Sequence, residues 1–224
     1  MFEDRGEAGE ALASALREFK DLDPVVYALP RGGVPVAAVV AKRLGAPLDL
    51  ILVRKLGAPR QPELAIGALV DGAAPITILH EEIIRALGIG ADYIRSTEAA
   101  ALAETERRRA VFYRDRDPVS PKNRTVIIVD DGLATGATME AAVKAMRKAG
   151  ANRIIVAVPV APADAATKFR EIADEFLCVE APSAFCAVGN HYRNFPQLAD
   201  SDVLRILADF EKEAGPRRKR TGPA

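Results

Sequence analysis

Short apolar runs recur along the chain between segments of helical periodicity, and this alternation predicts the architecture. The runs are rich in β-branched residues and occupy positions 25–29, 48–53, 126–129, 154–158 and 176–179. Because they contain few polar positions, they predict strands that are buried on both faces, as in a parallel sheet.

Three intervening segments carry the start and stop signals of helices. Residues 34–44 have a proline in the first turn and Gly45 after the last, and residues 137–149 end before Gly150. Residues 162–173 also begin with a proline. Strands and helices that alternate in this way predict an α/β fold, with a doubly wound, mainly parallel sheet and right-handed crossovers.

The segment between the second and third apolar runs breaks this rhythm. It is about seventy residues long, which far exceeds an ordinary crossover. We therefore expect an insertion at about 56–122 within a single domain over residues 1–214. Strands at 64–70 and 76–79 and a helix at 92–111, rich in alanine and glutamate, are expected inside it.

Charge and cysteine content limit the classes of function. The 224 residues include 31 Lys and Arg and 31 Asp and Glu, so no net field draws the chain to nucleic acid or to an anionic membrane. No apolar run approaches the ~18 residues of a membrane span, and Cys178 and Cys186 lack the spacing of a zinc site. We expect a soluble, cytoplasmic protein that binds neither nucleic acid nor membrane. Residues 215–224 are basic and rich in glycine and proline, which predicts a disordered tail.

The most informative stretch is VIIVDDGLATGATM, residues 126–139. Asp130 and Asp131 follow a buried strand, and ligands of a parallel sheet bind at the carboxyl ends of its strands. A loop of small and hydroxyl-bearing residues then leads into a helix, whose first amides have no partner inside the helix and attract anions. A phosphate beside two carboxylates predicts a ligand that also carries hydroxyl groups or a metal, such as a sugar phosphate.

Two common phosphate-binding motifs require a spacing that this stretch does not have. A P-loop needs GxxxxGK[ST], but the first lysine after Gly132 is Lys144. A dinucleotide site needs GxGxxG, which Gly132 and Gly136 do not provide. The alternative that remains is a plain helix cap, because aspartate and threonine are good capping residues.

Residues 126–138 resemble the phosphoribosyl pyrophosphate motif of the type I phosphoribosyltransferases. The resemblance implies a Rossmann-like phosphoribosyltransferase fold in which Asp130 and Asp131 reach the ribose 2- and 3-hydroxyls. It also implies that the 5-phosphate binds to a loop formed by Ala134, Thr135, Gly136, Ala137 and Thr138.

The stretch ALPRGGVPVA, residues 28–37, is a second glycine turn between a strand and a helix. It resembles the pyrophosphate loop of the same family, in which Gly32 and Gly33 would offer backbone amides and Arg31 would neutralise charge. A cis peptide that does not precede proline is common in this loop, and the matching bond is Pro30–Arg31. A plain turn is the alternative.

Three segments around these turns are assigned by position. Arg54 and Lys55 follow the second strand, where family members often carry a basic residue on the pyrophosphate; solvated charges are the alternative. Residues 56–70 would begin a mobile loop that closes over the site and excludes water. The run at 104–114 could place arginines over the pyrophosphate, although a solvated face with ion pairs fits it better.

Residues 181–200 follow the last strand and resemble the short hood that family members place over the acceptor base. Tyr192 or Phe195 could stack on a ring and His191 could exchange a proton, with a surface position for His191 as the alternative. No purine, orotate or uracil signature is found, so the acceptor stays unassigned.

The resemblance implies an enzyme of nucleotide metabolism, a pentosyltransferase that moves ribose 5-phosphate from phosphoribosyl pyrophosphate to a nitrogenous, nucleobase-like acceptor and releases pyrophosphate. Mg²⁺ would bind through the pyrophosphate and ribose, with Asp130 and Asp131 as further oxygen ligands. Arg31 and the two aspartates would form the catalytic group. The alternative is a regulatory protein that binds phosphoribosyl pyrophosphate without catalysis, which would need a nucleic-acid-binding element. A homodimer is expected from the frequency of symmetric assemblies alone.

Overall fold

The centre of the fold is a five-stranded parallel sheet, seen in a computed structural model that describes residues 1–71, 75–114 and 116–214. The strand order is β2-β1-β6-β7-β8, and every neighbouring pair is parallel. The strands are β1 (Val25–Ala28), β2 (Leu48–Leu50), β6 (Thr125–Val129), β7 (Arg153–Val160) and β8 (Glu175–Glu180). The expected doubly wound parallel sheet is confirmed.

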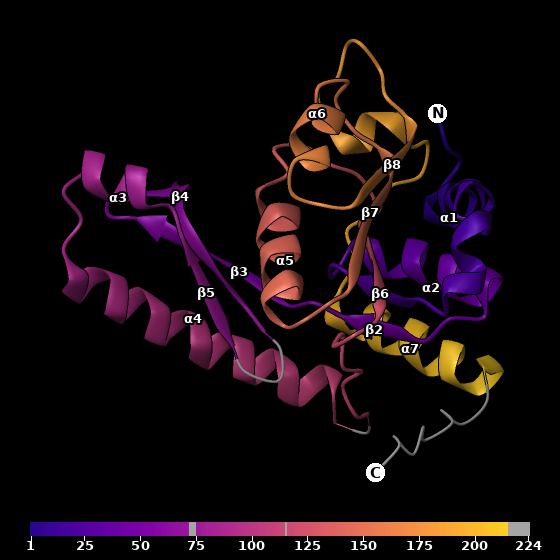
Figure 1. Cartoon of the computed structure of the whole chain (residues 1–224), viewed down its shortest axis with the longest axis horizontal. Coiled ribbons are helices and arrows are strands. Elements are labelled where there is room, and N and C mark those ends of the chain that lie inside the picture. The colour runs from indigo at the N-terminus through magenta and orange to yellow at the C-terminus, as the bar shows by residue number, and fades with distance from the viewer. Residues whose placement is uncertain (72–74, 115, 215–224) are drawn as a thin grey trace.

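Helices cover both faces of this sheet (Figure 1). One layer consists of α1 (Arg5–Ala15), α2 (Gly33–Leu44) and α7 (Asp200–Ala214), and the other of α5 (Ala137–Lys148) and α6 (Ala165–Arg170). Successive strand residues enter opposite cores: Val26 and Ile127 pack with the first layer, whereas Val25 and Ile128 pack with the second. All four side chains are fully buried, which explains the uninterrupted apolar runs.

The insertion is a separate lobe that we call the arm, residues 53–112. It contains an antiparallel sheet of β3 (Val53–Ala58), β4 (Gln61–Val70) and β5 (Ile76–Leu79), followed by α3 (Glu81–Ala86) and α4 (Ala91–Phe112). The arm has its own small apolar core and extends to one side of the central sheet (Figure 1). No helix in the described part of the chain, the 22-residue α4 included, is long and apolar enough to cross a membrane.

The structure differs from the predicted elements in three places. The run at 48–53 is not one strand, because β2 ends at Leu50 and Val53 begins β3 in the other sheet. Residues 56–70, expected as the start of a mobile loop, form most of the β3–β4 hairpin, and their closing movement stays a prediction. The helix expected at 162–173 is confined to α6, residues 165–170. The predicted tail at 215–224 lies outside the described residues, and the single-domain division stays a prediction.

Helix α1 was not predicted, and close packing on α2 explains its composition. A Cβ atom at Gly9 would lie 2.8 Å from the Cβ of Val39, so a glycine is needed where the two helices meet. Asp4 caps the helix by accepting hydrogen bonds from the amides of Gly6 and Glu7. Two glycines in a helix of 11 residues weaken the helical signal in the sequence.

Asp49 of β2 anchors the segment by which the chain returns from the arm. Its buried carboxylate accepts hydrogen bonds from the Tyr113 hydroxyl, 2.9 Å away, and from the amides of Leu50 and Val119. Tyr27 in turn donates its hydroxyl proton to the Val119 carbonyl. Burial raises the pKa of Asp49, and these hydrogen bonds oppose the increase.

Asp49→Ala should therefore lower the free energy of unfolding by about 2–4 kcal/mol, because the Val119 amide would lose its acceptor and the Tyr113 hydroxyl would keep only the Leu50 carbonyl, 3.0 Å away. Tyr113→Phe, which removes only one of these donors, should cost about 1 kcal/mol. Urea unfolding followed by circular dichroism measures both changes. Equal losses for the two variants would contradict the role given to Asp49.

Candidate active site

Two loops meet at the carboxyl ends of β1 and β6, which are neighbouring parallel strands. The amide of Leu29 donates a hydrogen bond to the Val129 carbonyl over 3.0 Å, so the β1–β6 pairing continues to the last residue before each loop. The first loop carries Arg31, Gly32 and Gly33, and the second begins with the two aspartates. The structure therefore brings together the two turns that the sequence singled out.

Glycines allow the first loop to touch the acid pair. A Cβ atom at Gly32 would lie 2.1 Å from Oδ2 of Asp131, and one at Gly33 would lie 2.9 Å from Cα of Asp130. The Pro30–Arg31 peptide is cis, as the resemblance implies. The Arg31 side chain is exposed and has no ion pair among the described residues.

The second loop wraps the N-terminus of α5. Gly136 adopts a left-handed φ of 73°, and a Cβ atom there would lie 2.9 Å from the Phe169 ring, so both backbone and space require glycine. Ala134, Thr135, Ala137 and Thr138 are exposed around it. Amides of the first helical turn have no acceptor inside the helix, and this exposed turn can therefore bind an anion.

Arg5 forms an ion pair with Asp131, and the sequence alone did not predict this contact. Its Nε and Nη2 atoms each lie 2.9 Å from Oδ2 of Asp131, and Nη1 donates to the Pro196 carbonyl over 2.9 Å. Its guanidinium lies 3.8 Å from the centre of the Phe195 ring. Arg5 precedes Asp131 by 126 positions, and nothing in its local sequence distinguishes it from other arginines.

The hood residues form the wall behind this ion pair. Tyr192 is buried between the rings of Phe2 and Phe195, and its hydroxyl donates to the Asp131 carbonyl over 2.6 Å. His191 is only half-buried and stacks on Phe185 at a ring distance of 5.3 Å. Acceptor binding by Tyr192, Phe195 and His191 stays a prediction; Tyr192 is buried, whereas His191 and Phe195 are half-buried.

Similarity to known proteins extends over most of this chain. A family model described as the phosphoribosyl transferase domain matches residues 5–190, which contain both loops, the acid pair and Arg5. The chain belongs to the phosphoribosyltransferase family. The expected family and fold are confirmed.

Relatives of this phosphoribosyltransferase domain agree with the match. Two Mycobacterium tuberculosis sequences, provisionally named as phosphoribosyl transferases, are 45% identical to it over 207 residues, which is 92% of this chain and 46% of theirs. The chain thus spans about half the length of these curated relatives. The crystal structure of TT1426 from Thermus thermophilus is 41% identical, with a TM-score of 0.82 over 94% of this chain and 99% of that one.

Arg54 and Lys55 of the phosphoribosyltransferase domain point to opposite faces of β3, because successive residues of a strand alternate. Arg54 faces α4, where its Nη1 lies 3.9 Å from Glu104. Glu104 also pairs with Arg107 and Arg108, and the hydrogen bond from Arg107 lowers the pKa of Glu104 to about 2. Arg54, Arg107 and Arg108 are thus tied to Glu104 of the arm. Pyrophosphate binding by Arg54 or Lys55 stays a prediction.

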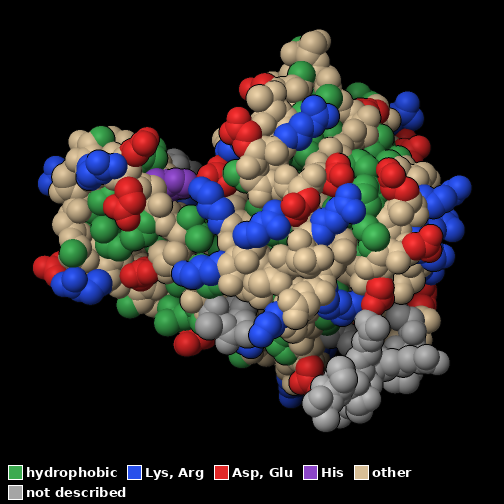
Figure 2. Space-filling model, viewed as in Figure 1, with side chains coloured by type: hydrophobic (Ala, Val, Ile, Leu, Met, Phe, Trp, Pro, Cys, Tyr) green, Lys and Arg blue, Asp and Glu red, His purple; other side chains and the backbone are tan. Residues whose placement is uncertain are grey.

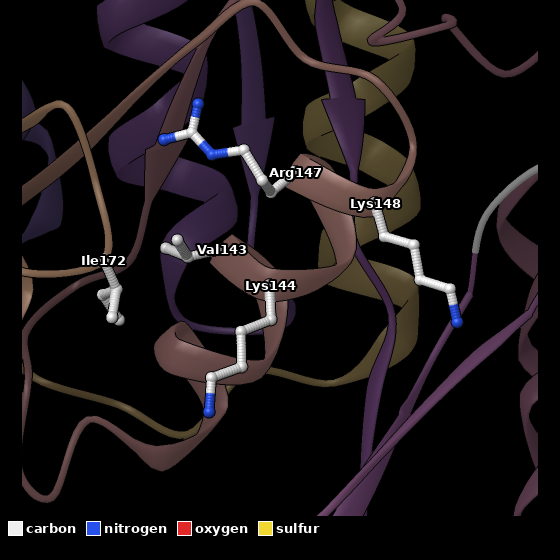
Figure 3. Close-up of a pocket in the computed structure, with 5 residues that line it drawn as sticks. All are labelled: Val143, Lys144, Arg147, Lys148 and Ile172. Carbon is white, nitrogen blue, oxygen red and sulfur yellow. The ribbon is translucent and has the colours of Figure 1, made fainter.

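A groove lies along the C-terminal half of α5, whereas the candidate site lies at the N-terminus of this helix (Figure 3). Lys144, Arg147 and Lys148 line it, but they project in different directions from the helix. Lys144 pairs with Glu140 and Arg147 with Asp174. A narrower recess lies where β4 and β5 of the arm approach the N-terminal half of α5, in the notch between the two lobes in Figure 2. Its lining reaches Ala137 of the second loop.

Burial gives the acid pair unusual titration behaviour. Desolvation and the neighbouring charge of Asp131 raise the pKa of Asp130 well above its usual range. Desolvation also raises the pKa of Asp131, although Arg5 opposes that increase. The unfolded chain releases the Asp130 proton near pH 4, so the stability contributed by protonated Asp130 is present below about pH 4 and is lost as the pH rises through its folded-state pKa.

Asp130→Asn should therefore raise the melting temperature at about pH 8, with a gain that shrinks toward about pH 4. Asparagine keeps the acceptor oxygen that Asp130 presents to the amide of Asp131, 2.8 Å away, without the ionisation. Differential scanning fluorimetry over this pH range measures the effect, with Asp21→Asn, an exposed carboxylate, as control. A variant less stable than the original chain at about pH 8 would refute this role of burial.

Proposed function

We propose that this domain transfers ribose 5-phosphate from phosphoribosyl pyrophosphate to a nitrogenous, nucleobase-like acceptor and releases pyrophosphate. The observation that carries the proposal is the contact between two anion-binding turns across one acid pair: Gly32 of the first turn touches Asp131, which lies at the start of the second. A phosphate at each turn and a ribose between them would place the sugar hydroxyls against the carboxylates.

Each loop has a distinct role in this proposal. The amides and hydroxyls of Ala134–Thr138 bind the 5-phosphate through charge-assisted hydrogen bonds. The Gly32 amide would donate to the pyrophosphate, whereas the Gly33 amide donates to the Leu29 carbonyl over 3.0 Å and closes the turn. The exposed Arg31 neutralises the charge of the pyrophosphate as it leaves. The bond from the anomeric carbon to the pyrophosphate oxygen breaks with its electron pair, the acceptor nitrogen forms the new bond, and the nitrogen loses its proton.

The carboxylates act on the positive charge that develops on the sugar ring. Asp130 and Asp131 lie beside the ribose, where fixed negative charge in a poorly solvated site stabilises an oxocarbenium-like transition state. Asp131 would accept the proton that the acceptor nitrogen loses.

The residues present fit a magnesium ion held mainly by the ligand. In the described residues no three His, Cys, Asp or Glu side chains converge on one point, whereas the oxygens of the acid pair are the hard ligands that Mg²⁺ prefers. Asp130 and Asp131 would hold the ion, with pyrophosphate, ribose hydroxyls and water as the other ligands. When bound, it supplies positive charge to the departing pyrophosphate.

Calorimetric titration with phosphoribosyl pyrophosphate, with and without Mg²⁺, tests the binding half of the proposal. A panel of purine, pyrimidine and other nitrogenous bases, assayed for released pyrophosphate, tests the transfer half. Binding without release for every base would favour the second candidate, a regulatory protein, and a gel-shift assay would then test nucleic-acid binding. Absence of binding in both titrations would refute the proposal.

A further inference from the structure

Arg5 is a buried cation, and its side chain contacts residues of the candidate site and of the hood. Its side chain is 10% exposed and that of Asp131 is 13% exposed, so this ion pair is shielded from water. A buried charge is costly unless it is paired and hydrogen-bonded. Both conditions are met by Asp131, the Pro196 carbonyl and the Phe195 ring.

Two independent attachments fix the position of Arg5. It is the first residue of α1, and α1 packs on α2, the helix that follows the pyrophosphate turn. The residues before it are bonded to the hood: the amide of Phe2 donates to the His191 carbonyl over 2.8 Å, and the amide of Asn194 donates to the Glu3 carbonyl over 2.9 Å. Arg5 therefore cannot move without disturbing either the helix layer or the hood.

The guanidinium occupies one side of the Asp131 carboxylate only. Nε and Nη2 both reach Oδ2, the same oxygen that a side chain at Gly32 would strike. This arrangement restricts the rotation of the carboxylate. It also lowers the repulsion between Asp131 and an anionic ligand.

We propose that Arg5 is a positioning residue of the phosphoribosyl site: it orients the Asp131 carboxylate toward the ribose and links it to the hood through Phe195 and Pro196. This inference rests on the proposed function, because it assumes that the ribose lies at the acid pair. The role depends on the planar fork of arginine, which a lysine cannot reproduce even though it keeps the charge.

Titrations of three variants with two probes test this role. The probes are phosphoribosyl pyrophosphate with Mg²⁺, which would contact the acid pair, and inorganic pyrophosphate without Mg²⁺, which would contact only the first turn. Arg5→Gln and Arg5→Lys should each weaken binding of the first probe about tenfold or more, because hydrogen bonds to a charged group are lost. Binding of the second probe should change less than about threefold.

Arg193→Ala is the matched control. Arg193 also joins the N-terminal segment to the hood, through Glu3 at 3.1 Å, but its side chain is 70% exposed. An exposed ion pair contributes little, so this variant should bind both probes within about fivefold of the original chain.

The possible failures are distinguishable. If the original chain does not bind phosphoribosyl pyrophosphate, the proposed function falls and the role of Arg5 falls with it. If the original chain binds and Arg5→Gln binds equally well, only the role of Arg5 is overturned. Equal weakening of both probes would make Arg5 a general structural residue, and full affinity in Arg5→Lys would show that charge alone suffices; either result overturns the positioning role.

Discussion

Replacing Asp130 and Asp131 together by asparagine should abolish turnover while the domain still binds phosphoribosyl pyrophosphate. The turnover number should fall at least about 100-fold, because the variant lacks the negative charge that stabilises the developing positive charge of the ring. Asparagine retains the size and one acceptor oxygen, so ribose hydroxyls can still bond and the loss of affinity should be smaller than the loss of turnover. Pyrophosphate release with an active acceptor measures the first quantity, and calorimetry measures the second.

Glu81→Gln with Glu82→Gln is the matched control for this double variant. These two acids are also adjacent in sequence and lie in the first turn of a helix, α3, but both are exposed on the arm. The control removes the same formal charge and should keep the original turnover. A double aspartate variant with an unchanged turnover number would end the assignment of these residues to catalysis.

Local patterns predicted the parts of the site that are local in sequence. The acid pair, the second loop and the start of α5 are contiguous from Asp130 to Thr138, and strand-loop-helix signals in that stretch place them at one edge of the sheet. The first loop has the same form after β1. Their proximity follows from the parallel pairing of β1 with β6, because carboxyl ends of parallel strands share an edge.

Long-range contacts were not predictable in the same way. Arg5 reaches Asp131 only because α1 docks on α2 and residues 2–3 bond to the hood, and no periodicity in the sequence encodes either contact. The change of sheet after Leu50 was missed for a related reason. Ile51 and Leu52 remain buried while the chain passes from one sheet to the other, so the apolar run continues without a polar break.

The aromatic residues of the hood have contacts that the sequence did not predict. Tyr192 and Phe195 were expected to offer rings to an acceptor, yet the Tyr192 hydroxyl bonds to the Asp131 carbonyl and the Phe195 ring packs under Arg5. A sequence specifies an amphipathic ring without specifying which neighbour will bury it. Here the two rings support Asp131 and its partner Arg5, and any contact with an acceptor would be in addition to that role.

Gly33→Ala should reduce binding of both phosphoribosyl pyrophosphate and inorganic pyrophosphate by about tenfold or more, and should reduce turnover about 100-fold. The added methyl would lie 2.7 Å from the Val129 carbonyl oxygen and 2.9 Å from Cα of Asp130. Both are backbone atoms at the end of a central strand and cannot yield, so the pyrophosphate turn must move away from the acid pair. A displacement of about 1 Å at such a site is enough for this loss of rate.

Gly90→Ala is the control that separates this steric effect from a general intolerance of alanine. Gly90 has a φ of −72° at the start of α4, and a Cβ atom there would have no neighbour within 4 Å. Gly90→Ala should therefore bind both probes as the original chain does.

Gly33→Ala and the Arg5 variants should differ in which probe they weaken. Gly33 belongs to the pyrophosphate turn, so its replacement should weaken the binding of both probes. Arg5 acts on the ribose side, so its replacement should weaken only the binding of phosphoribosyl pyrophosphate. Original affinity for pyrophosphate in Gly33→Ala would mean that the turn at Arg31–Gly33 does not bind it.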